Sequence, residues 1–188
     1  MRNTILEPIA RTVSVVFGGI FTGFLITVLV LELSLRKFDA SVYTQVRQVE
    51  LVRLDNLATA TLLPTIVATA VLIFVGLKRG RPGLGLTSVA LAFLLVVFVT
   101  TAAINLPINS DQLDWSVTRP PADWASDRDR WQIAHAVRTV AAALAFGCLV
   151  FASGLHRRQS PSVEPHVDLP SRGWGQGRHN RRTRPYSP

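Results

Sequence analysis

Four long stretches of this chain carry no charged residue, and this pattern limits the possible folds most. A membrane-spanning helix needs roughly 20 mostly apolar residues to cross a hydrocarbon core about 30 Å thick. The uncharged stretches are Thr12–Leu31, Leu57–Leu77, Gly83–Ser110 and Thr139–Leu155. The last is the shortest, and the residues just before it complete a span. So many uncharged residues in one small chain argue against the buried helices of a soluble protein.

The predicted fold is therefore all-α: a four-helix transmembrane bundle formed by residues 1–156. The predicted spans are about 13–35, 57–77, 83–107 and 131–155. The loop after the first span has a stripe of valines spaced three or four residues apart, which is typical of an amphipathic helix lying on the bundle or at the membrane interface. These valines are Val42, Val46, Val49 and Val52. Residues 157–188 are rich in Arg, Pro and Gly, a composition that predicts a disordered basic tail.

Charge in the connecting segments predicts the orientation in the cell membrane. Lysine and arginine are more frequent before the first span, in the short loop at 78–82 and in the tail than in the other two loops, which puts both termini in the cytoplasm. The first apolar stretch exceeds the roughly 7–15 residues of a secretory signal core, so we expect it to be retained. The net charge of +8 resides largely in the tail, and it favours anionic membrane lipids over nucleic acid as a partner. The oligomeric state has no signal in the sequence.

A polar cluster is predicted where the fourth span begins. Trp131, His135 and Arg138 are four and three residues apart, so they share one face of a helix. A charge inside a span is costly unless it is paired, and Arg138 should therefore face protein. Glu32 is the acidic residue that falls within the predicted spans. We expect a structural ion pair between Glu32 and Arg138 that ties the first helix to the last.

Two further groups of polar residues have either a structural or a functional role. Asn105 and Asn109 flank Pro107, which should unwind the third helix because proline disfavours helical geometry in the residue before it. Thr61 and Thr65 are four apart on the second helix. Their hydroxyls either bond back to their own helix or form a polar stripe that contacts a substrate inside the bundle.

Together these side chains suit base catalysis on an apolar substrate. His135 can act as a general base, while Arg138, Asn105 and Asn109 stabilise an oxyanion. Trp131 can stack on a substrate ring. A disulfide within the chain is excluded because Cys148 is the single cysteine. The histidines other than His135 fall at or beyond the last helix end, so we expect neither a metal site nor a cofactor.

Two paired motifs carry a resemblance to a known family. An N-x-P-x-N segment falls on Asn105, Pro107 and Asn109, and a W-x-x-x-H-x-x-R segment falls on Trp131, His135 and Arg138. With the VYTQVRQVE and LLPT segments, the chain from about 11 to 156 resembles the anthrone-oxygenase-like family of small four-helix membrane proteins. The resemblance implies a four-helix bundle. For some members it also implies cofactor-independent oxidation of anthrones to anthraquinones by O2.

Two hypotheses follow for the function. In the first, the protein is a membrane-embedded oxidoreductase that acts on a small hydrophobic, enolisable aromatic compound. In the second, it is a non-enzymatic integral membrane protein that binds a lipid-like ligand or a protein partner, and the polar cluster is structural. Loss of turnover without loss of folding in a His135→Ala variant would favour the first hypothesis.

Overall fold

The computed structural model describes residues 3–79 and 83–158, and this part of the chain is helical, with no β-strand. The elements are α1 (Asn3–Leu35), α2 (Ala40–Arg79), α3 (Leu84–Thr100), the π-helix η1 (Thr101–Asn105), α4 (Leu106–Leu113) and α5 (Trp124–Arg158). The predicted all-α class is confirmed. The predicted disordered tail falls, from residue 159 onward, outside the described residues.

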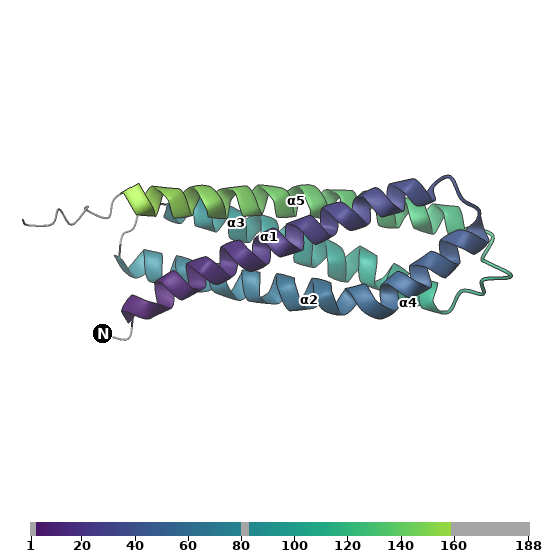
Figure 1. The fold of residues 1–188 in the computed structure, drawn as a ribbon, viewed down its shortest axis with the longest axis horizontal. Helices are drawn as coiled ribbons and strands as arrows, with labels where there is room; N and C mark the ends of the chain where they lie inside the picture. Colours follow the sequence, from purple (N-terminus) through teal and green to yellow (C-terminus); the bar gives the residue numbers. More distant parts are fainter. Residues whose placement is uncertain (1–2, 80–82, 159–188) are drawn as a thin grey trace, which may run out of the picture.

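Four rods lie side by side along the long axis of the molecule, as Figure 1 shows. Three of them are α1, α2 and α5, and the fourth is the succession of α3, η1 and α4. We call the end with residues 36–39 and 114–123 the distal end. Both described chain ends, the C-terminal end of α2 and the N-terminal end of α3 lie at the opposite, terminal end. Gly83 directly precedes α3, and its φ of 86° is a left-handed conformation that glycine adopts without strain.

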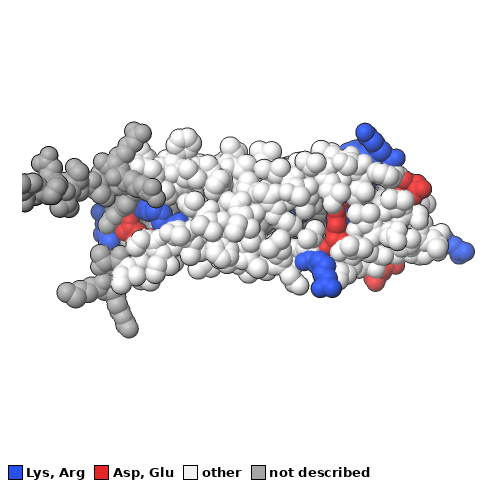
Figure 2. All heavy atoms as spheres, in the orientation of Figure 1, with Lys and Arg blue, Asp and Glu red and all other residues white. Residues whose placement is uncertain are grey.

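Four segments are long and apolar enough to cross a membrane, so the chain is a multi-pass membrane protein. They are Ile5–Leu35, Asn56–Arg79, Leu84–Leu113 and Trp124–Leu155. Many large apolar side chains point outward along them, including Val67, Val99 and Phe151, each more than half exposed. Figure 2 shows that the middle of the visible face carries neither acidic nor basic side chains, which gather toward the two ends. The side of the membrane on which the termini lie stays a prediction.

The segment predicted as an amphipathic helix is helical, but it is not separate from the second rod. Helix α2 is continuous for 40 residues, so the segment is the distal part of the second rod. Its valines point outward, with Val49 and Val52 67% and 63% exposed, whereas Arg47 and Glu50 are buried. An amphipathic helix turns its apolar side to the protein only when water lies outside. Here the outward valines are suited to lipid and the inward charges pair within the protein.

The prediction that the third helix unwinds before Pro107 is wrong. The rod continues through the proline because residues Thr101–Asn105 form a π-helix, and α4 starts at Leu106 with the proline in its first turn. Proline removes one backbone donor and crowds the preceding turn. A wider turn accommodates both effects, and such π-helical turns are frequent at functional sites.

The core of the bundle lies between all four rods and is mostly aliphatic. Its central residues are Phe21, Leu25, Leu62, Leu94, Ala145 and Leu149, each at most 6% exposed. Close approach of α1 to α5 depends on Gly19, because a Cβ there would lie 3.2 Å from the ring of Phe146. The core separates the two ends of the bundle, and the polar residues are therefore divided into a distal group and a terminal group.

Candidate active site

A cavity of about 280 Å³ lies in the distal half of the bundle and is lined by residues from all four rods. This volume is near the lower end of the roughly 300–1,000 Å³ found for pockets that take small organic ligands. Most of its wall is apolar, including Phe21, Phe24, Val28, Leu54 and Leu62. The polar part of the wall is formed by Arg47, Glu50, Asn109, Trp131 and Arg138, with Thr59 and Thr101 nearby.

Arg47 is the centre of the polar part, and its guanidinium is fully engaged. Nη1 lies 3.0 Å from Oε1 of Glu32 and 2.7 Å from Oε2 of Glu50. Nε donates to Gln112 Oε1 and Nη2 donates to Asn109 Oδ1, both at 3.0 Å. The Arg47 side chain is only 2% exposed. A buried charge is tolerated where it is paired and its donors are satisfied, and Arg47 meets both conditions.

The predicted ion pair between Glu32 and Arg138 is wrong. The cation that pairs with Glu32 is Arg47, from the segment that the sequence assigned to a loop. The second carboxylate oxygen of Glu32 accepts from the amide of Gln132 at 3.1 Å. Glu32 therefore ties α1 both to α2, by charge, and to α5, by a hydrogen bond.

Glu50 is the acidic side chain in the cavity wall. Its Oε2 is held by Arg47, but its Oε1 is buried and has no hydrogen-bond partner among the described residues. Burial raises the pKa of Glu50; the attraction of Arg47 opposes this, and the neighbouring carboxylate of Glu32 adds to the rise. A carboxylate whose pKa is raised is a stronger base than an exposed one. A side-chain hydrogen bond with Glu32 contributes to the raised pKa as well. Glu50 thus places a basic carboxyl group, shared between Arg47 and Glu32, beside an apolar cavity.

Arg138 reaches the cavity from α5 and is held in place by His135. Its Nε and Nη2 lie 2.9 and 2.7 Å from Nδ1 of His135, and Nη1 donates to Thr101 Oγ1 at 3.3 Å. A guanidinium cannot accept, so Nδ1 is the acceptor. Nε2 therefore carries the imidazole proton and donates to the carbonyl of Leu25 at 3.0 Å. Both ring nitrogens of His135 are engaged, and His135 is not among the residues that line the cavity.

Trp131 connects the two arginines. Its ring stacks on His135 with centroids 4.7 Å apart, and the guanidinium carbon of Arg47 lies 4.1 Å from the ring centroid. Its indole N–H donates to Asn109 Oδ1 at 2.6 Å. Because the ring already contacts a histidine and an arginine, little of its face is free for the predicted stacking on a substrate.

The two asparagines of the N-x-P-x-N motif differ in their surroundings. Asn109 lines the cavity and accepts from both Arg47 and Trp131. Asn105 is fully buried, donates to the carbonyl of Trp131 at 3.3 Å, and does not line the cavity. The structure therefore brings both motifs into one network, in which Asn109 alone of the pair faces the cavity.

The predicted contact of Thr61 and Thr65 with a substrate is not supported by their placement. Each hydroxyl donates to the carbonyl four residues earlier, at 2.8 Å in both cases. Neither residue is part of the cavity wall. The alternative, hydroxyls bonded back to their own helix, is what the structure shows.

Sequence reasoning missed Arg47 and Glu50, two of the three charged residues that line the cavity in the described part of the chain. The signal was present in their spacing: they are three residues apart in a segment with valines at 42, 46, 49 and 52. In a segment surrounded by water, a stripe of valines opposite a stripe of charged residues indicates an interfacial helix. In a segment that belongs to a spanning helix, the same pattern predicts that the charged face points into the bundle.

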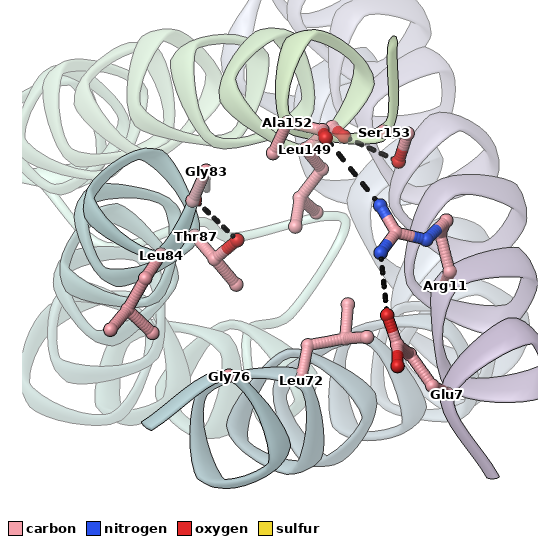
Figure 3. Close-up of a pocket in the computed structure, with 10 residues that line it drawn as sticks. All are labelled: Glu7, Arg11, Leu72, Gly76, Gly83, Leu84, Thr87, Leu149, Ala152 and Ser153. Carbon is pink, nitrogen blue, oxygen red and sulfur yellow. Dashed lines mark hydrogen bonds and ion pairs between the residues drawn. The ribbon is translucent and has the colours of Figure 1, made fainter. Parts of the chain in front are cut away.

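A second charged cluster lies at the terminal end, shown in Figure 3. Arg11 donates to Glu7 at 3.1 Å and lies 3.5 Å from the carbonyl of Ala152, and Arg79 pairs with Glu7 at 3.2 Å. The adjoining pocket has a volume of about 30 Å³, which is the share of liquid volume that one water molecule occupies. This cluster joins α1 to α2 and α5. Arg11 also borders a more open groove of about 420 Å³ between α1 and α5, whose other lining residues carry no charge.

Comparison with known proteins gives one match. The family model described as anthrone oxygenase matches residues 56–148. The matched stretch is consistent with an anthrone-oxygenase-like domain. The domain includes Asn109, Trp131, His135 and Arg138, whereas Glu32, Arg47 and Glu50 precede it. Searches of curated proteins and of solved structures found no similar chain.

Proposed function

We propose that this protein is a membrane-embedded, cofactor-independent oxygenase that acts on a small hydrophobic, enolisable compound of the anthrone type. The observation that supports the proposal best is Glu50 itself, an acidic residue that lines an apolar cavity beside Arg47 and Arg138 and has one buried oxygen without a hydrogen-bond donor among the described residues. The anthrone-oxygenase-like domain supports the reaction class. The apolar wall suits a fused-ring ligand, and the polar part suits its single carbonyl.

Proton removal is the step for which this geometry is best suited. Glu50 accepts a proton from the acidic CH2 group opposite the ligand carbonyl, and the electron pair moves onto the carbonyl oxygen as an enolate. The guanidinium of Arg138, which also lines the cavity, stabilises that negative charge, while Arg47 holds Glu50. Fixed donors in a site of low dielectric are worth more than the same donors in water. The protein thus supplies a base and an oxyanion site, which is all that activation of an enolisable carbon requires.

The oxidant in this proposal is O2 dissolved in the bilayer. The enolate carbon transfers its electrons to O2 and forms a C–O bond, giving a peroxide that takes up one proton. Loss of water from this hydroperoxide, with the remaining hydrogen of the carbon, leaves a second carbonyl. One oxygen atom enters the product and the other leaves as water, so the reaction balances without a cofactor.

The role of general base passes in this proposal from His135 to Glu50. Both nitrogens of His135 are engaged, and the ring lies behind Arg138 rather than in the cavity wall. His135 then acts as a positioning residue that fixes the guanidinium of Arg138 toward the ligand. Asn109 serves in the same way for Arg47.

The test is turnover of 1,8-dihydroxyanthrone by the purified protein in nanodiscs, followed by quinone absorbance and O2 uptake. The Glu50→Gln variant should lose at least about 100-fold in turnover, because a positioned base contributes roughly 10²–10⁴-fold. Glu7→Gln is the matched control, since Glu7 is also buried and paired with arginine but lies at the terminal end. Equal turnover by wild type and Glu50→Gln would contradict the proposal.

The second candidate function is binding of a hydrophobic ligand without chemistry. The cavity itself favours it, because an apolar chamber with a polar end also suits a carrier or a sensor of lipid-like molecules. If the wild-type protein binds the anthrone tightly but produces no quinone above the rate of spontaneous oxidation, binding without chemistry is the function.

A further inference from the structure

The cavity reaches the surface of the bundle on one side. Five of its lining residues are exposed: Thr59, Leu63, Phe98, Ala102 and Leu106. The first two belong to α2, and the other three follow one another along α3, η1 and α4. We call this set of five residues the mouth. Every one of them falls within a segment that is apolar and long enough to cross a membrane.

The cavity is closed toward the distal end. Tyr43, Arg47 and Gln112 form a buried polar layer there, with exposed fractions of 0%, 2% and 0%. The layer is tied together, because Gln112 accepts from Arg47 and lies 3.3 Å from the hydroxyl of Tyr43. The loop at 114–123 contributes no residue to the cavity wall. A solute arriving in water at the distal loops therefore meets a hydrogen-bonded barrier.

The cavity is closed toward the terminal end as well. The core residues Leu25, Leu94 and Leu149 are each at most 2% exposed and lie between the cavity and the terminal cluster. Among the described residues that line the cavity, the exposed ones all lie on the side between α2 and the third rod.

We propose that the ligand enters the cavity sideways from the lipid, through the mouth between α2 and the α3–η1–α4 rod. A small side chain, Ala102, stands at its centre, on the wider turn of the π-helix. The mouth is apolar apart from Thr59, and the arginines lie at the inner part of the wall. A flat, lipid-dissolved carbonyl compound fits this arrangement, with its reacting groups at the inner wall and an apolar ring edge facing the bilayer. The chemical class of the ligand rests on the proposed function, but the route does not.

The test uses 1,8-dihydroxyanthraquinone as a binding probe in nanodiscs, with quenching of tryptophan fluorescence as the readout. Trp131 lines the cavity, so a bound quinone should quench it. Leu63→Phe and Ala102→Phe narrow the mouth without adding a tryptophan. Val67→Phe and Val99→Phe are matched controls, because both are lipid-facing, 62% and 59% exposed, and absent from the cavity wall. The two mouth variants should slow association of the probe severalfold relative to their controls.

The outcomes separate the route from the chemistry. Equal association rates in mouth and control variants would overturn the lateral route and leave the proposed reaction intact. Slower association together with absent turnover in wild type would support the route and overturn the oxygenase. Failure of the wild-type protein to bind the probe at all would overturn both. Phe98→Ala should widen the mouth and speed association, which checks that slow binding by the phenylalanine variants is not due to misfolding.

Discussion

The two ends of this bundle use the same residue types for different purposes. At the terminal end, Glu7 is held by two arginines that are 22% and 32% exposed, around a pocket that fits one water molecule. At the distal end, two carboxylates share one nitrogen of Arg47, all of them 8% exposed or less, beside a cavity about nine times larger. The terminal cluster satisfies its acid with an excess of cations. The distal cluster leaves one oxygen of Glu50 without a hydrogen-bond donor among the described residues, and this surplus of base is what makes it a candidate site.

The largest expected effect comes from removing the shared cation. Arg47→Met should lower the free energy of unfolding by about 3–5 kcal/mol, because it leaves two buried carboxylates without their partner. Arg11→Met at the terminal end should cost about 1 kcal/mol or less, since that arginine is partly exposed. Reversible unfolding in mixed micelles measures both. Similar costs at the two ends would remove the distinction drawn between them.

Glu50 should show opposite effects on activity and stability. The pKa of its carboxyl is raised in the folded protein, so the fold is favoured while Glu50 is protonated and loses that contribution as the pH rises through the raised pKa. Glu50→Gln should therefore unfold no more easily than wild type above that pH, although it loses turnover. Glu7→Gln should be less stable than wild type and keep its turnover. Unfolding and activity measured at pH 8 test the crossover, which a purely structural Glu50 would not show.

The pH profile separates Glu50 from His135 as the base. Turnover should fall as the pH drops through the raised pKa of Glu50, because the base must be ionised. His135→Ala should reduce the rate by loosening Arg138 but keep the same acidic limb of the profile. If the limb disappears in His135→Ala and persists in Glu50→Asp, the roles assigned to these two residues must be exchanged.

The smallest effects are expected on the second helix. Thr61→Val and Thr65→Val should change turnover little, because each hydroxyl bonds to its own helix and lies outside the cavity wall. Stability should change by about 1 kcal/mol or less, the usual worth of one hydrogen bond. A large loss of turnover in either variant would return these threonines to the substrate site.

Features that depend on residues near one another in the chain could be predicted from the sequence, whereas contacts between helices could not. The four spans follow from uncharged stretches, and the cluster of Trp131, His135 and Arg138 follows from helical spacing, so both were accessible. The partner of Glu32 was not, because pairing between helices depends on the rotation of each rod about its axis. Arg138 was chosen as the cation inside a predicted span. Arg47 was overlooked because α2 extends further than its uncharged stretch.

The same cause explains why Glu50 was overlooked. The period and polarity of the segment around Val42–Val52 correctly indicated a helix, but the segment was assigned to a loop and not to the second rod, so its charged residues were not considered as part of the bundle interior. The catalytic roles predicted for His135, Arg138, Asn105 and Asn109 are a separate matter and stay predictions. What the structure adds is that Arg138 and Asn109 reach the cavity, while His135 and Asn105 support them from behind.

The π-helical turn at Thr101–Asn105 determines how α4, which follows it in the third rod, is rotated about the rod axis. A regular α-helix turns by about 100° per residue, and a π-helical turn takes up one residue more. Were the same residues wound as an ordinary α-helix, α4 would be rotated by about that angle, and Asn109 and Gln112 would point away from Arg47. A one-residue irregularity in the backbone thus determines whether the guanidinium on the neighbouring rod finds its acceptors.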